Sequence, residues 1–123
     1  KLAEEHILIP VCPEQMGGLP TPRISSERQR TASGSLRSIN RAGAVLMKDG
    51  TDVTDNYKKG AEMALSLAKL MGADTAILKS GSPSCGKEII YDGSFTGAKK
   101  KGDGVTTELF KRTGISVLTE EDL

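Results

Sequence analysis

Aromatic residues and net charge are both scarce in this sequence. Two tyrosines, two phenylalanines and no tryptophan make up 3% of the 123 residues, and 17 basic residues against 16 acidic ones leave a formal net charge of +1. Proteins that bind single-stranded nucleic acid stack its bases on aromatic side chains and follow its phosphates with a basic groove. The composition therefore excludes general binding of DNA or RNA.

Long apolar runs are also missing. No stretch approaches the roughly 18 consecutive apolar residues of a membrane-spanning helix, and no signal-peptide pattern is present. We therefore expect a cytoplasmic protein that does not interact with a membrane, and we assign residues 1–123 to a single domain. The first residues, "KLAEEHILIPVC", read as the end of a helix leading into a strand, so we expect a further N-terminal segment before them.

Cysteine is rare, with only Cys12 and Cys85 present. Because a reducing compartment disfavours structural disulfides, each cysteine is interpreted first as a reactive thiol or a metal ligand. Both can equally be small buried apolar side chains. The number of cysteines alone does not decide between these alternatives.

Three apolar runs have the length of strands, at residues 7–11, 75–79 and 115–119. Helical patterns separate them. Short continuous apolar runs of this kind are typical of parallel strands that are covered on both faces.

Two helices are predicted between the strands. The first begins at Thr54 or Asp55, whose side chains can cap its free N–H groups, and ends at Gly72. The second runs from Gly104 to Arg112. Helices that alternate with strands predict an α/β domain with a largely parallel sheet.

Residues 24–43 interrupt this alternation. They contain four arginines and five serines without clean periodicity. We expect a mobile surface loop, and the alternative is a lid whose arginines bind an anionic substrate. The run "AVLMKDGTDVT" that follows is a further candidate strand.

The segment "GSPSCGK", residues 81–87, has the spacing of a phosphate-binding P-loop. However, Pro83 has no N–H group to offer a phosphate, and Glu88 stands where a Ser or Thr would bind magnesium. The next residues, "EIIYDG", are strand-like and do not begin a helix. The match is therefore a coincidence of spacing.

Each cysteine follows the end of a predicted strand. Because the carboxyl ends of parallel strands share one edge of a sheet, we expect Cys12 and Cys85 to converge there. Glu14 adds a carboxylate at this edge. The loop of Cys85 adds the hydroxyl groups of Ser80, Ser82 and Ser84. Taken singly, Glu14 reads as a solvated charge and the serines as turn formers, but together with two thiols they indicate an inorganic site with acid–base groups.

Three long motifs carry a resemblance to a known family. They are "VCPEQMGGLPTPR" at 11–23, "GTDVTDNYKKGAEMAL" at 50–65 and "ILKSGSPSCGKEIIYDGSFTGAKKKGDGVTTELFKRTGISVLTEE" at 77–121. In these motifs the chain resembles the thiouracil-desulfidase-like family, also known as domain of unknown function five-two-three. The resemblance covers nearly the whole chain except 24–43.

The resemblance implies a Rossmann-like, three-layer α/β domain that holds a 4Fe-4S cluster through three cysteines. Carried over by motif, Cys12 and Cys85 are two of these ligands. The first cysteine of the family lies in an N-terminal strand-and-loop motif that has no counterpart in this chain. We therefore expect the sheet to lack that strand, and this chain as given to lack the cluster and to be inactive.

The resemblance also implies a substrate, a thiolated pyrimidine base or nucleotide from which sulfur is removed. Glu14 and Ser82, with Ser84 as the second choice for the hydroxyl, are the expected proton-handling groups. The expected substrate-binding residues are Arg23, Ser80 and Lys87.

Two alternatives remain open at this point. One is a cluster-free domain without catalytic activity that binds a small molecule or anion, with Arg23 and Lys87 as counter-charges. The other is a zinc site, for which His6 and the two cysteines form only a partial ligand set. His6 also reads as an ordinary residue where a helix meets a strand.

Overall fold

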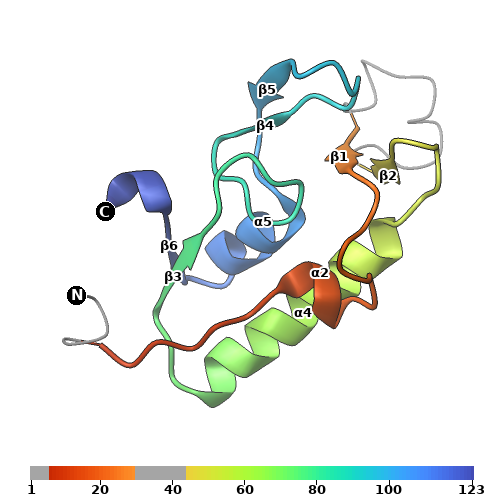
Figure 1. Cartoon of the computed structure of the whole chain (residues 1–123). Helices are drawn as coiled ribbons and strands as arrows, with labels where there is room; N and C mark the ends of the chain where they lie inside the picture. Colours follow the sequence, from red (N-terminus) through yellow and green to blue (C-terminus); the bar gives the residue numbers. More distant parts are fainter. Residues whose placement is uncertain (1–5, 30–43) are drawn as a thin grey trace.

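The computed structural model describes residues 6–29 and 44–123, in which helices and short strands alternate (Figure 1). The elements in chain order are α2 (Pro13–Met16), β1 (Ser26–Arg28), β2 (Val45–Met47), α4 (Thr54–Leu70), β3 (Thr75–Leu78), β4 (Ile89–Tyr91), β5 (Lys99–Lys101), α5 (Val105–Arg112), β6 (Ser116–Thr119) and the 3-10 helix η2 (Glu120–Asp122). This order confirms the predicted α/β class.

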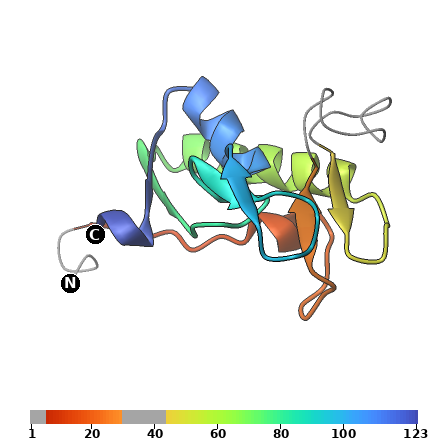
Figure 2. The ribbon, with the colours of Figure 1, turned by 90° about the horizontal axis from the view of Figure 1, so that it is seen from above.

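Helix α4 is the element that connects the parts of the molecule. Figure 2 shows the β1–β2 pair at one end and the β3–β6 pair at the other, with α4 running between them. Helix α4 also packs against both α2 and α5. None of the helices in the described part of the chain is long and apolar enough to cross a membrane.

The sheet is less regular than the sequence predicted. Strands β3 and β6 pair in parallel, with Thr75 opposite Ser116, which confirms the runs at 75–79 and 115–119 as strands. Within residues 6–29 and 44–123, however, the β1–β2 and β4–β5 pairs are antiparallel. The expectation of a mostly parallel, three-layer Rossmann-like sheet is therefore met only as an α/β fold with one parallel pair.

The predicted strand at 7–11 is wrong for this structure. The segment has no regular secondary structure and pairs with none of the described strands. The side chain of Ile7 is 90% exposed. Residues 7–11 instead form one wall of an apolar groove of about 560 Å³, and β3 together with residues of α4 and α5 forms the rest.

Both predicted helices are present, with one correction. The N-cap residue of α4 is Val53, whose side chain makes no capping hydrogen bond. Just before it, Oδ1 of Asp52 accepts the N–H of Thr54 at 2.9 Å and its hydroxyl at 2.6 Å. Thr54 and Asp55 are themselves helical, so the predicted cap was placed too late. Gly72, with φ of +71°, follows the end of the helix as expected.

Strand β1 lies inside the segment predicted as a mobile loop, 24–43. It pairs with β2, which confirms the candidate strand after that segment, while residues 30–43 lie outside the described residues. The sequence hid β1 because its central residue, Glu27, is charged and yet buried. Oε1 of Glu27 accepts the N–H groups of Gly93 and Phe95 at 2.9 and 3.1 Å, which compensates for its burial.

Candidate functional site

Cys12 stands immediately before helix α2, as its N-cap residue. The helix begins with Pro13, whose fixed φ and missing N–H suit the first helical position. The side chain of Cys12 is half-buried, and its Sγ accepts a long hydrogen bond of 3.9 Å from Nη2 of Arg23. The thiol is thus partly accessible and lies beside a positive charge.

Glu14, in the first turn of α2, is held by two donors. The hydroxyl of Tyr57 donates to its Oε2 at 2.7 Å, and Nε of Arg23 donates to the same oxygen at 3.1 Å. Burial of Tyr57 raises the pKa of its hydroxyl, and the hydrogen bond to Glu14 raises it further. Tyr57 is therefore a neutral, permanent donor that fixes the orientation of the carboxylate.

Arg23, expected to bind substrate, is occupied by groups of the protein. Besides Glu14 and Cys12, its Nη1 donates to the carbonyl of Pro20 and to Oγ1 of Thr21, both at 2.8 Å. Burial opposes its charge, but the hydrogen bond and the charge of Glu14 outweigh this effect and raise the pKa of Arg23. Its contacts are those of a residue that orders the Cys12 and Glu14 side chains.

The loop that carries Cys85 is attached to the N-terminus of α5. Three of its carbonyl groups accept N–H groups there: Gly86 from Gly104 at 2.7 Å, Pro83 from Val105 at 2.8 Å and Ser84 from Thr106 at 2.8 Å. In addition, Oγ1 of Thr107 donates to the carbonyl of Cys85 at 2.8 Å. The loop thereby satisfies the free N–H groups at the start of the helix and is fixed by them.

The thiol of Cys85 is buried, with 9% of the residue exposed, in the larger apolar cluster of the protein. Burial raises its pKa to about 11, and the charges of Glu14 and Cys12 act in the same direction. Met16 of α2 packs against the same apolar cluster, so the helix that follows Cys12 and carries Glu14 lies beside the cluster that contains Cys85. The roles of Cys12 and Cys85 as ligands and of Glu14 as proton carrier stay predictions. The burial of Cys85 also agrees with the alternative of a small apolar side chain.

The serines of this loop have different surroundings. Oγ of Ser82 accepts the N–H groups of Ser84 and Cys85 at 3.0 and 3.1 Å, so it shapes the turn. Ser84 is fully buried, and its hydroxyl pairs with that of Thr106 at 2.8 Å. Of the two expected catalytic hydroxyls, Ser82 is the one that lines a cavity.

Ser80 contacts a carboxylate from the end of the chain. Its N–H and hydroxyl both donate to Glu120, at 2.9 and 2.6 Å. These hydrogen bonds lower the pKa of Glu120 to about 2. Ser80 also lines the cavity, so its expected role in substrate binding stays a prediction.

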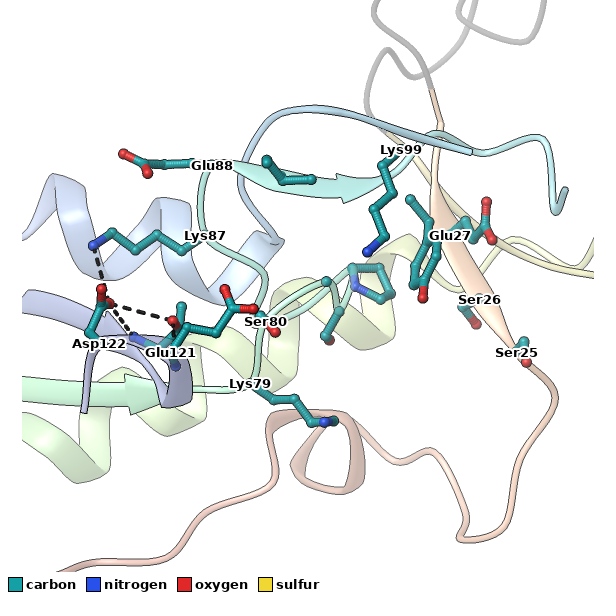
Figure 3. Close-up of a pocket in the computed structure, with 16 residues that line it drawn as sticks. Ser25, Ser26, Glu27, Lys79, Ser80, Lys87, Glu88, Lys99, Glu121 and Asp122 are labelled. Carbon is teal, nitrogen blue, oxygen red and sulfur yellow. Dashed lines mark hydrogen bonds and ion pairs between the residues drawn. The ribbon is translucent and has the colours of Figure 1, made fainter. Parts of the chain in front are cut away.

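A polar cavity of about 860 Å³ adjoins the Cys85 loop at Ser82. Figure 3 shows Lys79 and Lys99 approaching it from opposite sides. Lys87 lies on its rim but is turned toward Asp122, with 3.8 Å between Nζ and Oδ2 (Figure 3). The volume suits a small organic ligand.

A metal-binding set is only partly present. Among the residues that the structure describes, no three His, Cys, Asp or Glu side chains are arranged to hold a metal ion. His6 is exposed in the N-terminal segment, and the described residues give it no part in a zinc site. The donor chemistry of the two thiols fits an iron–sulfur cluster, for which thiolates are the usual protein ligands, but a complete set needs at least one more.

Three residues of this region were not predicted from the sequence. Tyr57 reads as part of the apolar face of α4, and Lys79 and Lys99 read as solvated charges. Their contacts depend on which helices and strands the fold brings together. The periodicity of residues along one element does not show which other elements pack against it.

Comparisons with known proteins identify the family of this chain. The sequence matches the family described as 2-thiouracil desulfurase over residues 1–122. It is 40% identical to the uncharacterized protein YbbK of Bacillus subtilis (strain 168), in an alignment that covers 100% of this chain and 80% of YbbK. A solved structure described as the 4Fe-4S-dependent thiouracil desulfidase TudS is 42% identical, with a TM-score of 0.85 over 99% of this chain and 73% of that one. The resemblance carried by the three motifs is confirmed.

Proposed function

Since this chain belongs to the 2-thiouracil desulfurase family, we propose that it removes the sulfur of a thiolated pyrimidine base or nucleotide with a 4Fe-4S cluster as cofactor. The observation that carries the proposal is geometric: Arg23 donates to both Glu14 and Cys12, and Met16 of the same helix as Glu14 packs against the apolar cluster that contains Cys85. The likeness to a 4Fe-4S-dependent thiouracil desulfidase supports the cofactor and the substrate class.

In the proposed reaction, water replaces sulfur on the pyrimidine ring. The ring C=S bond breaks, a C=O bond to the water oxygen forms, and sulfur leaves as hydrogen sulfide, so no oxidant or reductant is consumed. When bound, the cluster supplies an open iron that acts as a Lewis acid toward the thiocarbonyl sulfur. Cys12 and Cys85 would hold it.

Glu14 is suited to accept a proton from the attacking water. Both of its donors, Tyr57 and Arg23, bind Oε2, which leaves Oε1 without a hydrogen-bond partner in the described parts of the chain. A carboxylate fixed through one oxygen can use the other without changing its orientation. Ser82 is the better hydroxyl for a second proton transfer, because Ser84 is sealed from the cavity.

The polar cavity is the proposed substrate site. Ser82 Oγ accepts two N–H groups and keeps its own O–H as a donor for the pyrimidine, whereas the Ser80 hydroxyl donates to Glu120. The ammonium groups of Lys79 and Lys99 suit the phosphate of a nucleotide. Because Lys87 and Arg23 are engaged in ion pairs, they contribute less to the positive charge available for a ligand.

We place a further strand in the apolar groove between residues 7–11 and β3. The groove is walled by two apolar segments, and β3 pairs with β6 alone among the described strands. A strand inserted there would hydrogen-bond to both walls and complete a Rossmann-like parallel sheet. The occupant we propose for the groove is the strand that carries the third cysteine in the family that this chain resembles.

The protein, reconstituted anaerobically with iron and sulfide, provides the test. We expect a brown cluster absorbance, loss of the absorption band of thiouracil and release of sulfide. Cys12→Ser and Cys85→Ser should lose the cluster, whereas the exposed control Lys58→Ala should keep it. Absence of the cluster in the wild type, or a cluster without loss of the band, contradicts the proposal. A cytoplasmic location belongs to the same proposal, since cluster cysteines need a reducing compartment.

The alternative of a cluster-free binding domain is favoured by one observation, the lysine-lined polar cavity. It predicts that the cluster-free protein binds a pyrimidine nucleotide without converting it. Calorimetric titration with uridine monophosphate, followed by analysis of the recovered nucleotide, distinguishes the two functions.

A further inference from the structure

Helix α2 lies directly on the backbone of α4. At Gly60, a methyl group would overlap the carbonyl oxygen of Pro13, and at Gly17 it would overlap the carbonyl oxygen of Asn56. At these two positions the backbones of the helices touch with no side chain between them. Any larger residue there requires the helices to move apart.

The contact explains why glycine stands inside α4. Glycine in a helix interior destabilises the helix relative to alanine. Gly60 lies within the helix Thr54–Leu70, and its φ is not positive, so its conformation does not require glycine. The close approach of α2 is therefore the physical reason for a glycine at this position.

Two side chains of α4 add polar contacts to the same short helix. Nδ2 of Asn56 donates to the carbonyl of Gly17 at 2.9 Å, and the Tyr57 hydroxyl donates to Glu14. Residues four apart share one face of a helix, so Asn56 and Gly60 lie on the same face. Helix α4 thus holds α2 at its first residue, at Glu14 and at its C-cap.

A helix of four residues is not stable by itself, so the position of α2 depends on its packing. We propose that Asn56, Tyr57 and Gly60 are positioning residues that place Cys12 and Glu14 relative to Cys85. The roles of Cys12, Glu14 and Cys85 rest on the proposed function. The contacts between α2 and α4 are independent of it.

Helix α4 also links the two segments that carry Cys12 and Cys85. Helix α4 packs against α5, and α5 binds the carbonyl groups of the Cys85 loop. The same helix therefore supports both thiols, one through α2 and the other through α5. A shift of α2 on α4 changes the distance between the thiols, while the hydrogen bonds that fix the Cys85 loop to α5 stay in place.

The first test uses the cluster-free protein and the alkylation of each cysteine by iodoacetamide, followed by mass spectrometry. In Gly60→Ala, displacement of α2 should raise the alkylation rate of Cys12 by about tenfold and leave that of Cys85 within about twofold. Lys59→Ala, on the exposed neighbouring position, is the matched control and should leave both rates unchanged. If Gly60→Ala does not fold, Asn56→Ala removes one hydrogen bond without adding bulk and should raise the rate at Cys12 by about threefold.

The second test separates positioning from mere stability. In the reconstituted enzyme, Tyr57→Phe should lower kcat by about tenfold and leave both KM and the cluster content unchanged. A purely structural role would instead lower cluster content and kcat together. Unchanged Cys12 alkylation in both Gly60→Ala and Asn56→Ala overturns the proposal. If the variants alter the alkylation of Cys12 but the reconstituted wild-type protein shows no desulfidase activity, the proposed function is overturned and the positioning role stands.

Discussion

Gly104 lies against the carbonyl group of Ser84, so closely that a methyl group on Gly104 would overlap it. Gly104 is the N-cap residue of α5, with φ of −69° and ψ of 167°, a conformation open to any residue. Glycine is required here for space and not for backbone conformation. This contact brings the Cys85 loop close enough for its carbonyl groups to accept the first N–H groups of α5.

Gly104→Ala should therefore release the Cys85 loop. We expect a loss of about 2 kcal/mol in the free energy of unfolding, the usual cost of overpacking, and faster alkylation of Cys85 in the cluster-free protein. Gly114→Ala is the matched control, because its site is open but its φ is +87°. It should cost about 1 kcal/mol through backbone strain and leave Cys85 alkylation unchanged. Equal alkylation in the two variants contradicts the prediction.

The buried hydroxyl pair of Ser84 and Thr106 permits a second prediction. Ser84→Ala and Thr106→Val should each reduce the free energy of unfolding by about 1–2 kcal/mol, because each leaves the other hydroxyl buried without its partner. The double variant should cost clearly less than the sum of the two. Urea denaturation of the four proteins in this cycle measures the coupling, and strictly additive losses would show that the pair contributes nothing.

The sequence predicted the parts of the fold that local pattern encodes. The strands at 75–79 and 115–119 and both helices followed from apolar runs, glycine stops and helical spacing. The segment 7–11 has the same apolar pattern as a strand, but a strand also needs a neighbour, and the described residues place none beside it. The apolar pattern of a sequence identifies a segment that can form a strand. Whether a neighbouring strand is present to pair with it depends on the tertiary structure.

The residues of the candidate site stay predictions, and their hydrogen-bond partners did not follow from the sequence. Cys12, Glu14 and Cys85 were expected together because each follows the end of a strand run. That Arg23 would bind Glu14 instead of remaining free for a ligand did not follow from sequence, because the path of the chain between Glu14 and Arg23 decides whether the two side chains meet. The role of Gly60 was equally hidden, since a single glycine in a helix has no visible partner in sequence.

The pKa of Cys85 leads to a prediction on pH. Burial raises the folded pKa to about 11 from an ordinary value of 9.0. Both states are protonated below about pH 9, so the thiol leaves stability unchanged there, and stability is lost as the pH rises from about 9 to about 11, where the unfolded state loses its proton first. In the cluster-free protein, the alkylation rate of Cys85 should rise with pH up to about 11, whereas in urea it should level off near 9. A plateau near 9 in the folded protein contradicts the burial of the thiol.

The two cavity lysines allow the nucleotide to be distinguished from the free base. Lys79 and Lys99 approach the cavity from opposite sides, and Nζ of Lys99 lies 5.3 Å from the centre of the Tyr91 ring, which keeps its ammonium group in place (Figure 3). If they bind a phosphate, Lys79→Gln and Lys99→Gln should each raise KM for a thiolated nucleotide by about fivefold, the loss expected for one charge pair at a partly exposed site. KM for free thiouracil should stay unchanged, as should both values in the exposed control Lys58→Gln. The effect should shrink at high ionic strength, because salt screens the interaction. An equal rise in KM for the base and the nucleotide would mean that the lysines act on the ring or on the fold. The proposal of a nucleotide substrate would then be contradicted, whereas the free base would remain a candidate substrate.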